Sequence, residues 1–283
     1  MSLEPPRLLG VIGDPIEHSL SPRMHNAALA HLGLPFLYLP FHVTGRELKS
    51  FVRNMGRLGL AGINVTIPHK IAIIDLMDRM SDAARRVGAV NTVALVGGRR
   101  IGHNTDGEGF LSALRTKTGF NPRGETALLL GAGGAARAIA FALSQAGITR
   151  LAIVNRSTGA AERLAADLVN DRPDLKCSTY GLQSRGWRSE TEAANLIIQA
   201  TSLGLSDDHS VPVDFAHSPR GAVVCDLVYR QGLTPFLRRA KAHHLKILEG
   251  RSMLLWQGAL AFKIWTGHCP PLDVMAAALI KDS

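Results

Sequence analysis

The chain has 283 residues, of which 46% are hydrophobic and 19% are charged. This size and balance predict a protein with a full hydrophobic core, and the length favours two domains. The first residues include the charged Glu4, Arg7 and Asp14 and no long apolar run, so we expect no signal peptide. Because no apolar run approaches membrane-spanning length, we also expect no membrane partner.

The three cysteines, Cys177, Cys225 and Cys269, lie far apart and form no C-x-x-C pair. An odd number at such spacing predicts reduced thiols, and it argues against a disulfide framework or a cysteine metal site. We therefore expect a cytoplasmic protein. The histidines show no metal-ligand spacing either, so we assign no metal.

The formal net charge of +9 is the one feature of the composition that suits a nucleic-acid partner. However, the basic residues are scattered pairs without interleaved aromatic residues, and the densest patch, residues 238–246, is typical of the exposed face of a helix. A positive surface also raises the local concentration of small anions. We therefore expect a small-molecule substrate and no nucleic acid.

The first third of the chain alternates between predicted strands and helices, which is typical of a mixed α/β domain. The first helix is expected to begin with Ser21 as its cap and Pro22 in its first turn. Thr44 and Glu47 form a capping box for a second helix, and Pro68 predicts the first turn of a third. The strands are predicted at residues 8–12, 36–43 and 60–65, followed by a hairpin of residues 89–96 and 99–104.

A helix from Asp106 leads into a second α/β region whose strands are continuous apolar runs, as expected for a buried parallel sheet. Another helix is expected to start at Thr234 and Pro235. The strands are predicted at residues 126–130, 151–154, 195–200, 222–227 and 245–248, and two helices at residues 252–266 and 273–280 close the chain.

The most informative stretch is residues 125–157, in which a strand, a helix and a second strand carry the pattern G-x-G-x-x-A. Gly131 permits a tight turn, Gly133 lets backbone amides approach a pyrophosphate, and Ala136 lets the helix pack against the strand. The helix N-terminus then attracts the anion. We interpret this unit as a dinucleotide-binding Rossmann fold; a glycine-rich turn in an unrelated α/β domain is the alternative.

The end of the second strand of this unit indicates which dinucleotide is bound. NAD sites place an acid there to accept from the ribose hydroxyls. This chain has Asn155 and Arg156 instead, with no Asp or Glu before Glu162. Because an arginine attracts a ribose phosphate, the sequence predicts NADP. The alternative is an arginine that is merely exposed after a strand.

Lys70 and Asp106 are candidates for proton transfer. Lys70 is expected in the first turn of the helix opened by Pro68, where a cation faces the positive end of the helix dipole at some cost in stability. Asp106 precedes a helix, and a carboxylate close to Lys70 would hold the ammonium in place. A solvated lysine and a helix N-cap are the alternatives.

Other polar residues also interrupt apolar patterns. Gln257 lies in the apolar stripe of the helix 252–266, where an amide is costly unless it is paired. Its partner is expected to be either a hydroxylated ligand or a backbone carbonyl. Ser19 and Ser21 flank a strand-to-helix loop that could bind a carboxylate, and Asn91 and Thr92 interrupt an apolar strand.

Together, these segments resemble the shikimate dehydrogenase family over nearly the whole chain. The matching segments, in the family's order, are VIGDPIEHSLSPRMHN, GINVTIPHK, VGAVNTV, GHNTDGEGF, LLLGAGGAARA, VNRS, ATSLGL and GRSMLLWQGALAFKIWTG. The resemblance implies two α/β domains with a cleft between them. A mixed-sheet, substrate-binding catalytic domain would comprise residues 1–105 and 251–283, and a Rossmann-like NADP-binding domain would comprise residues 106–250.

The resemblance also implies individual roles. Lys70 and Asp106 would form the catalytic pair. The substrate-binding residues would be Ser19, Ser21, Asn64, Thr66, Asn91, Tyr229 and Gln257, with Asp106 also contacting a substrate hydroxyl. The cofactor-binding residues would be Gly131, Ala132, Gly133, Gly134, Ala135, Asn155, Arg156, Ser157, Thr201 and Gly250.

Some positions depart from the family pattern. Arg230 and Gln231 replace Asn-Pro after Tyr229, Gln199 replaces an Asn, and Leu205 replaces a frequent Met. A second arginine that helps to bind the ribose phosphate is Ala160 here, although Arg163 lies one turn further on. The last change predicts a weaker preference for NADP than Arg156 alone would give.

The resulting hypothesis is the reversible, NADP-dependent reduction of 3-dehydroshikimate to shikimate, a step of chorismate and aromatic amino acid biosynthesis. The first alternative is a quinate/shikimate dehydrogenase using NAD or NADP; Ser21 favours shikimate, because family members that take quinate can carry Thr there. The second is a non-catalytic nucleotide-binding sensor, which the presence of Lys70 and Asp106 disfavours. A homodimer is kept as a hypothesis.

Overall fold

The computed structural model describes residues 6–204, 211–230 and 232–280, so Leu205 and Gln231 lie outside the described residues. The chain divides into two compact units, Met1–Gly109 with Leu254–Ser283 and Phe110–Met253, which we call unit 1 and unit 2. Both boundaries fall within helices, α4 (Asp106–Thr118) and α9 (Gly250–Thr266), each of which contributes residues to both units.

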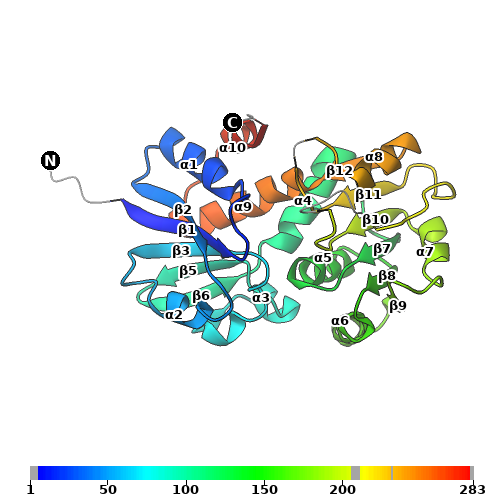
Figure 1. The fold of residues 1–283 in the computed structure, drawn as a ribbon, viewed down its shortest axis with the longest axis horizontal. Helices are drawn as coiled ribbons and strands as arrows, with labels where there is room; N and C mark the ends of the chain where they lie inside the picture. Colours follow the sequence, from blue (N-terminus) through cyan, green and yellow to red (C-terminus); the bar gives the residue numbers. More distant parts are fainter. Residues whose placement is uncertain (1–5, 205–210, 231, 281–283) are drawn as a thin grey trace. The chain divides into compact units, whose positions relative to one another are not determined.

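Unit 1 is built on a six-stranded mixed sheet in the order β2-β1-β3-β5-β6-β4 (Figure 1). β1 pairs in parallel with β2 and β3, whereas β5 is antiparallel to both β3 and β6, which confirms the predicted hairpin. The strands are β1 (Arg7–Gly13), β2 (Phe36–His42), β3 (Leu60–Val65), β4 (Arg79–Met80), β5 (Thr92–Val96) and β6 (Arg99–His103).

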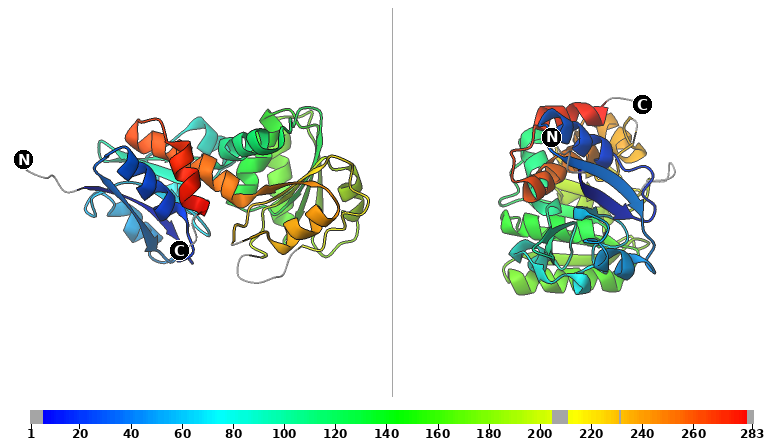
Figure 2. Two further views of the ribbon diagram at one scale, coloured as in Figure 1. Left: turned by 90° about the horizontal axis from the view of Figure 1, so that it is seen from above. Right: turned by 90° about the vertical axis from the view of Figure 1, so that its left-hand side faces the viewer.

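Helices cover both faces of this sheet, which is why its central strand β3 is buried at every residue. Figures 1 and 2 show α1 (Ser21–His31) beside α10 (Leu272–Ile280), with α9 on the same face. On the other face, α2 (Leu48–Arg53) packs its Leu48 and Val52 into a core with Ile12 and Ile63. The short α3 (Asp82–Val87) follows β4.

Unit 2 is a doubly wound parallel sheet in the order β12-β11-β10-β7-β8-β9. Counted from β7, this is the order 6-5-4-1-2-3 of dinucleotide-binding folds. The strands are β7 (Thr126–Leu130), β8 (Arg150–Asn155), β9 (Lys176–Gly181), β10 (Leu196–Gln199), β11 (Val223–Asp226) and β12 (Lys246–Glu249). The helices are α5 (Gly134–Gln145), α6 (Thr158–Asp171), α7 (Arg188–Ala193) and α8 (Pro235–Ala242), together with most of α4.

Three predicted helix starts are wrong. Thr44 is not the cap of α2, which begins at Leu48 with Glu47 in the cap position. Pro68 does not open a helix: residues 67–73 form successive turns that lead to a single 3-10 turn, Ile74–Leu76. The carbonyl of Lys70 accepts from Val90 N at 2.8 Å, which uses the acceptor that a continuing helix needs. Ser21 is the first helical residue of α1 and not its cap, which is Leu20 without a side-chain hydrogen bond.

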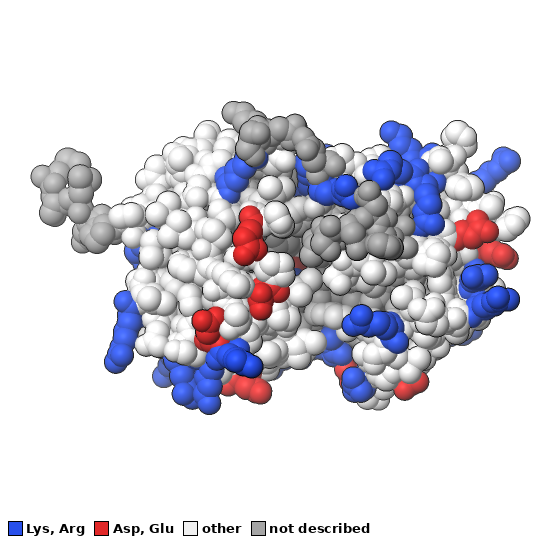
Figure 3. Space-filling model, in the orientation of Figure 1, with Lys and Arg blue, Asp and Glu red and all other residues white. Residues whose placement is uncertain are grey.

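Two further findings bear on the predictions from composition. No helix of the described residues is long and apolar enough to cross a membrane. Basic side chains occur in several separate groups on the face shown in Figure 3, with acidic side chains among them. On this face, the basic residues are not gathered in a single patch.

Candidate active site

The candidate site of unit 1 lies at one edge of its sheet. β1, β3 and β6 end at this edge, and β5 begins there because it runs antiparallel to its neighbours. Asn64 is paired with Thr92, and Thr92 with His103, so residues far apart in the sequence become cross-strand neighbours. The sheet topology therefore gathers the polar residues that follow or precede these strands.

Lys70 and Asp106 meet in this site. Lys70 Nζ donates to Asp106 Oδ2 at 2.6 Å, and only 14% of the lysine side chain and 4% of the aspartate side chain are exposed. Asp106 is the first residue of α4, and its carboxylate is committed to side chains rather than to capping that helix. Because Pro68 opens no helix, the expected conflict between Lys70 and a helix dipole does not arise.

Asn91 is the centre of the hydrogen-bond network behind this ion pair. Its Nδ2 lies 2.8 Å from Asp106 Oδ1 and 2.8 Å from Thr105 Oγ1, and 3.3 Å from Gln257 Oε1. Its Oδ1 accepts from the backbone N–H of Thr105 at 2.8 Å. With 2% of Asn91 exposed, these bonds satisfy a polar group that is almost fully buried, and they fix the second carboxylate oxygen of Asp106.

Gln257 reaches the same network from α9. Its Nε2 donates to the carbonyl of Leu254 at 3.0 Å, so the backbone alternative accounts for one end of the amide, while Oε1 faces Asn91. The backbones of α4 and α9 approach closely here, since a Cβ on Gly109 would lie 2.6 Å from Gln257 N. Gly109 therefore allows Gln257 to sit next to Asp106's helix.

The remaining predicted substrate residues of unit 1 lie at the same edge. Thr66 follows β3, and its methyl carbon would be 2.5 Å from a Cβ on Gly13, so it packs on the end of β1. Ser19 and Ser21 lie at the start of α1, where Ser21 N donates to Ser19 Oγ at 3.4 Å. Free backbone N–H groups at a helix start are suited to an anion such as a carboxylate.

The structure does not place every predicted residue in unit 1. Tyr229 belongs to unit 2, where it is half-buried in the segment after β11. The sequence analysis also missed Thr105 and Tyr38, both of which hydrogen-bond within the site. Thr105 carried a signal, because it lies directly before Asp106; Tyr38 lies in a strand at the other side of β1 and carried none.

The predicted nucleotide site of unit 2 is built from backbone. Gly131 has φ +121°, and a Cβ there would lie 2.9 Å from the carbonyl oxygen of Ala200, so only glycine fits. Gly133 caps α5 without any side chain, and a Cβ on it would meet nothing within 4 Å. The N-terminus of α5 is thus open for a pyrophosphate between β7 and β10, the switch point of the sheet.

Ala132, Gly134 and Ala135 belong to the same turn and to the first residues of α5. Thr201 follows β10, and Gln199 determines its position: Gln199 Oε1 accepts from both the backbone N–H and the hydroxyl of Thr201 at 2.7 Å. The other end of the Gln199 amide donates to Leu203 O at 2.9 Å. The Gln that replaces the family's Asn therefore closes the turn after β10.

The end of β8 supplies side chains for a ribose phosphate. Arg156 is exposed and makes no ion pair within the described part of the chain, while Asn155 Nδ2 donates to Ser157 O at 3.0 Å. Arg163 lies against the first turn of α6, 3.5 Å from where a Cβ on Gly159 would be. The residues present in this unit therefore fit NADP.

Gly250 has a packing role that is independent of any cofactor. A Cβ at this position would lie 2.4 Å from the carbonyl oxygen of Leu227 and 3.0 Å from that of Asp226. Gly250 therefore lets the start of α9 pack against the segment that follows β11.

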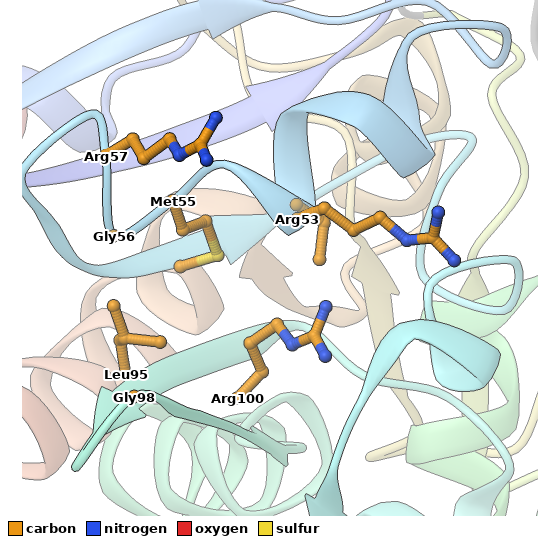
Figure 4. Close-up of a pocket in the computed structure, with 8 residues that line it drawn as sticks. Arg53, Met55, Gly56, Arg57, Leu95, Gly98 and Arg100 are labelled. Carbon is orange, nitrogen blue, oxygen red and sulfur yellow. The ribbon is translucent and has the colours of Figure 1, made fainter.

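A separate surface cavity of about 490 Å³ lies at the turn end of the β5–β6 hairpin, away from Asn91 (Figure 4). Arg53, Arg57 and Arg100 line it from different sides, together with Met55 and Leu95. Arg100 binds the carboxylate of Asp78 through Nε and Nη2, which lowers the pKa of that carboxyl to about 2. None of the predicted site residues lines this cavity.

Comparisons with known proteins assign a family to this arrangement. Residues 11–93 match the model of the shikimate dehydrogenase substrate binding domain. Residues 114–202 match that of shikimate / quinate 5-dehydrogenase, and residues 250–280 match that of the shikimate 5'-dehydrogenase C-terminal domain.

Individual relatives cover almost the whole chain. The shikimate dehydrogenase (NADP(+)) of Methanopyrus kandleri is 43% identical over 276 residues, which cover 97% of this chain and 95% of the relative. The crystal structure of shikimate 5-dehydrogenase from Thermus thermophilus with NADP(H) and shikimate is 39% identical, with a TM-score of 0.84 over 96% of this chain and 98% of that chain.

A quinate dehydrogenase from Corynebacterium glutamicum, in complex with NAD, is 30% identical, with a TM-score of 0.88 over 97% of this chain and 99% of that chain. The family models and the first of these relatives together span both units, from the strands of the substrate-binding domain to the C-terminal helices. The chain therefore belongs to the shikimate dehydrogenase family.

Proposed function

We propose that this protein catalyses the reversible, NADP-dependent reduction of 3-dehydroshikimate to shikimate, a step of chorismate and aromatic amino acid biosynthesis. The observation that carries this function is the buried Lys70–Asp106 ion pair, held at 2.6 Å within a network of neutral hydrogen-bonding side chains. The similarity to NADP-dependent shikimate dehydrogenases supports the same reaction.

When it is bound, NADPH supplies the hydride. Lys70 then gives a proton from Nζ to the alkoxide oxygen that develops on the substrate, and it takes that proton back in the opposite direction. Asp106 orients the ammonium group, and Asn91 holds Asp106 through its other oxygen. Because the lysine and aspartate side chains are largely buried, little water competes for this proton.

The other residues bind and orient the substrate in this proposal. The serines at the start of α1, Ser19 and Ser21, bind its carboxylate. Its hydroxyl groups contact Asn64, Thr66, Asn91, Asp106 and Gln257, and Tyr229 is also proposed to bind the substrate. The proposed substrate-binding domain comprises residues 1–105 and 251–283, and the proposed NADP-binding domain comprises residues 106–250.

For the cofactor, we propose that the turn of residues 131–135 binds the pyrophosphate through backbone N–H groups. Arg156 binds the ribose phosphate, with Asn155 and Ser157 in the same loop, and Thr201 and Gly250 complete the site. Arg163 supplies the second positive charge that Ala160 lacks, although from one turn further along α6.

The experiment that tests this function follows the nicotinamide absorbance of the purified protein with shikimate or quinate and with NADP or NAD. We expect the highest kcat/KM for shikimate with NADP. Preferred turnover of quinate with NAD would instead establish a quinate/shikimate dehydrogenase. The similarity to the quinate dehydrogenase of Corynebacterium glutamicum favours this second candidate function. Binding of the nucleotide without any turnover would instead identify a non-catalytic sensor.

Two further proposals, on cellular location and on oligomeric state, are tested by other means. We propose a cytoplasmic location, which cell fractionation would check, and a homodimer, which light scattering during size-exclusion chromatography would check. A monomeric mass at micromolar concentration would reject the dimer.

A further inference from the structure

Asn64, a proposed substrate-binding residue, is held in a single orientation by three hydrogen bonds. Its Nδ2 donates to the carbonyl of Asn91 at 3.2 Å and to Thr92 Oγ1 at 3.1 Å, and its Oδ1 accepts from the hydroxyl of Tyr38 at 2.7 Å. A backbone carbonyl only accepts, so the Asn91 carbonyl requires Nδ2, and not Oδ1, to face β5. The amide oxygen must therefore face Tyr38.

These bonds leave one hydrogen-bond acceptor position of Asn64 unused. An asparagine amide has two donor hydrogens and two acceptor positions on its oxygen. Both hydrogens of Asn64 are used within the protein, and one acceptor position is used by Tyr38. What remains for a ligand is a single acceptor, on a residue that is 95% buried, since its exposed fraction is 5%.

Both the backbone and the side chain of Tyr38 are held in place, although Tyr38 lies on an edge strand. It lies on β2, two strands from Asn64, and its side chain reaches past β1 to the end of β3. Asn26 of α1 bonds both its backbone N–H and its carbonyl at 2.8 Å. Its ring is fully buried and stacks on the ring of His25, with centroids 4.4 Å apart and planes 13° apart.

The stacking partner is uncharged. Burial lowers the pKa of His25 to about 3, and neither of its ring nitrogens has a hydrogen-bond partner within the described part of the chain. A neutral, flat ring against Tyr38 restricts the position of the tyrosine ring without competing for its hydroxyl. Contacts from α1, β2 and α9 thus hold the Tyr38 hydroxyl against Asn64. The contact from α9 is made by Trp265, whose ring lies against that of Tyr38.

We propose that Tyr38 is a positioning residue that presents Asn64 to the substrate as a hydrogen-bond acceptor only. The proposal rests on the proposed function, because it takes Asn64 to contact a substrate hydroxyl. An acceptor at Asn64 selects a hydroxyl group, which donates, and disfavours a ketone, which only accepts. The donor Lys70 has the opposite preference, so the two residues together orient the ring with its ketone oxygen toward Lys70.

Tyr38→Phe tests this proposal, because it keeps the stacked ring and removes only the hydroxyl. We expect KM for shikimate to rise about 5- to 10-fold, the effect of one lost hydrogen bond, while kcat and KM for NADP change less than about twofold. The matched control is Tyr180→Phe in unit 2, which removes a tyrosine hydroxyl that donates to Glu190 at 2.6 Å. That variant should leave KM for shikimate unchanged.

A double-mutant cycle shows whether Tyr38 acts through Asn64. In the Asn64→Ala background, Tyr38→Phe should no longer alter KM for shikimate, because the group that it positions is absent. The double variant lacks both partners of the Tyr38–Asn64 hydrogen bond, so neither group of that bond is left buried and unpaired. An equal effect of Tyr38→Phe in both backgrounds would overturn the proposal.

Two further outcomes separate this inference from the proposed function. A lowered melting temperature of Tyr38→Phe with an unchanged KM for shikimate would show that Tyr38 is merely a core residue, and it would overturn the inference while leaving the function intact. If the unmodified protein does not turn over shikimate, the proposed function itself fails. If Asn64→Ala alone leaves KM unchanged, Asn64 does not contact the substrate, and the inference fails with it.

Discussion

The candidate sites of the two units are constructed in different ways. In unit 1, side chains hold one another: Asn91 holds Asp106, and Asp106 holds Lys70, all at low exposure. In unit 2, the backbone supplies the proposed site, through the turn at Gly131 and the open start of α5, and the cationic side chain of Arg156 lies exposed without an ion-pair partner in the described residues.

This difference determines how each site should respond to substitution. Members of a buried polar network depend on one another, so the effects of changing two of them are expected not to add. An exposed side chain such as Arg156 acts independently, and the shape of a backbone turn changes only where a Cβ collides with its surroundings. The following variants test this contrast, from the largest expected effect to the smallest.

Lys70→Ala removes the proton donor at the centre of the network. We expect kcat for shikimate oxidation to fall about 10²- to 10⁴-fold, with a modest change in KM, because the proton transfer is lost while the binding groups remain. Steady-state kinetics measure both constants. Lys263→Ala, an exposed lysine on α9, is the control and should behave like the unmodified protein. Near-native kcat in Lys70→Ala would exclude this residue from proton transfer.

Gly131→Ala and Gly133→Ala distinguish the effect of backbone strain on stability from the effect of an added methyl group on cofactor binding. An alanine at 131 must adopt φ near +121° with its Cβ 2.9 Å from Ala200 O, so we expect a destabilisation of about 1–3 kcal/mol even without cofactor. Gly133→Ala meets open space and should leave the melting temperature of the free protein unchanged.

Both glycine variants should raise KM for NADP, since each places a methyl group in the turn that approaches the pyrophosphate. Thermal melts and cofactor titrations of the two variants distinguish these effects. Equal melting temperatures of Gly131→Ala and the unmodified protein would contradict the strain argued for this turn.

Arg156→Ala should weaken NADP far more than NAD. We expect KM for NADP to rise about 10-fold, the loss of one charge-assisted contact, and KM for NAD to stay within about twofold. The NADP effect should also shrink at high salt, because the arginine is exposed. Arg163→Ala should give a smaller change of the same kind. Equal effects on the two cofactors would show that Arg156 does not contact the ribose phosphate.

The smallest effect on catalysis is expected at Asp226, whose substitution should change stability and not rate. This carboxyl accepts from Thr234 Oγ1 at 2.6 Å and Val228 N at 3.0 Å, and burial raises its pKa from 3.8 to about 6. The folded state therefore holds this proton more tightly than the unfolded state. The contribution of Asp226 to the free energy of unfolding is fully present below about pH 4 and falls as the pH rises to about 6.

Asp226→Asn should remove that slope, by at most about 3 kcal/mol for a pKa difference of about two units. Denaturant titrations of both proteins between pH 4 and pH 7 measure the difference. Asp174→Asn is the control: Arg172 lowers the pKa of the exposed Asp174, so any small slope there has the opposite sign. Parallel curves for Asp226→Asn and the unmodified protein would reject the prediction.

The contrast between the units also explains which predictions from sequence were correct. The glycine turn of unit 2 is a local pattern, in which strand, turn and helix follow one another within residues 126–145, so the sequence indicated it directly. The turn after Pro68 was predicted wrongly, because the hydrogen bond from Val90 N to Lys70 O comes from a segment 20 positions away. Local helix signals do not include such a competitor.

Unit 2 also contains elements whose residues carry weaker signals. α6, α7 and β9 were not predicted, and β9 is an edge strand whose residues are mostly half-buried, so it lacks the apolar run that marked β7 and β8. The order of the six strands was not predicted either. A parallel strand needs only a neighbour on each side, and nothing in its own residues states which strand that neighbour is.

Residue types and their local spacing determined by themselves that this chain has α/β units, a dinucleotide turn, and a lysine, an aspartate and amides available for chemistry. Only the tertiary structure decided that Lys70 and Asp106 are 2.6 Å apart, that Asn91 holds the aspartate, and that Tyr38 reaches Asn64. The physical reason is that side-chain hydrogen bonds act over about 3 Å, whereas strand pairing brings together residues that are tens of positions apart in the chain.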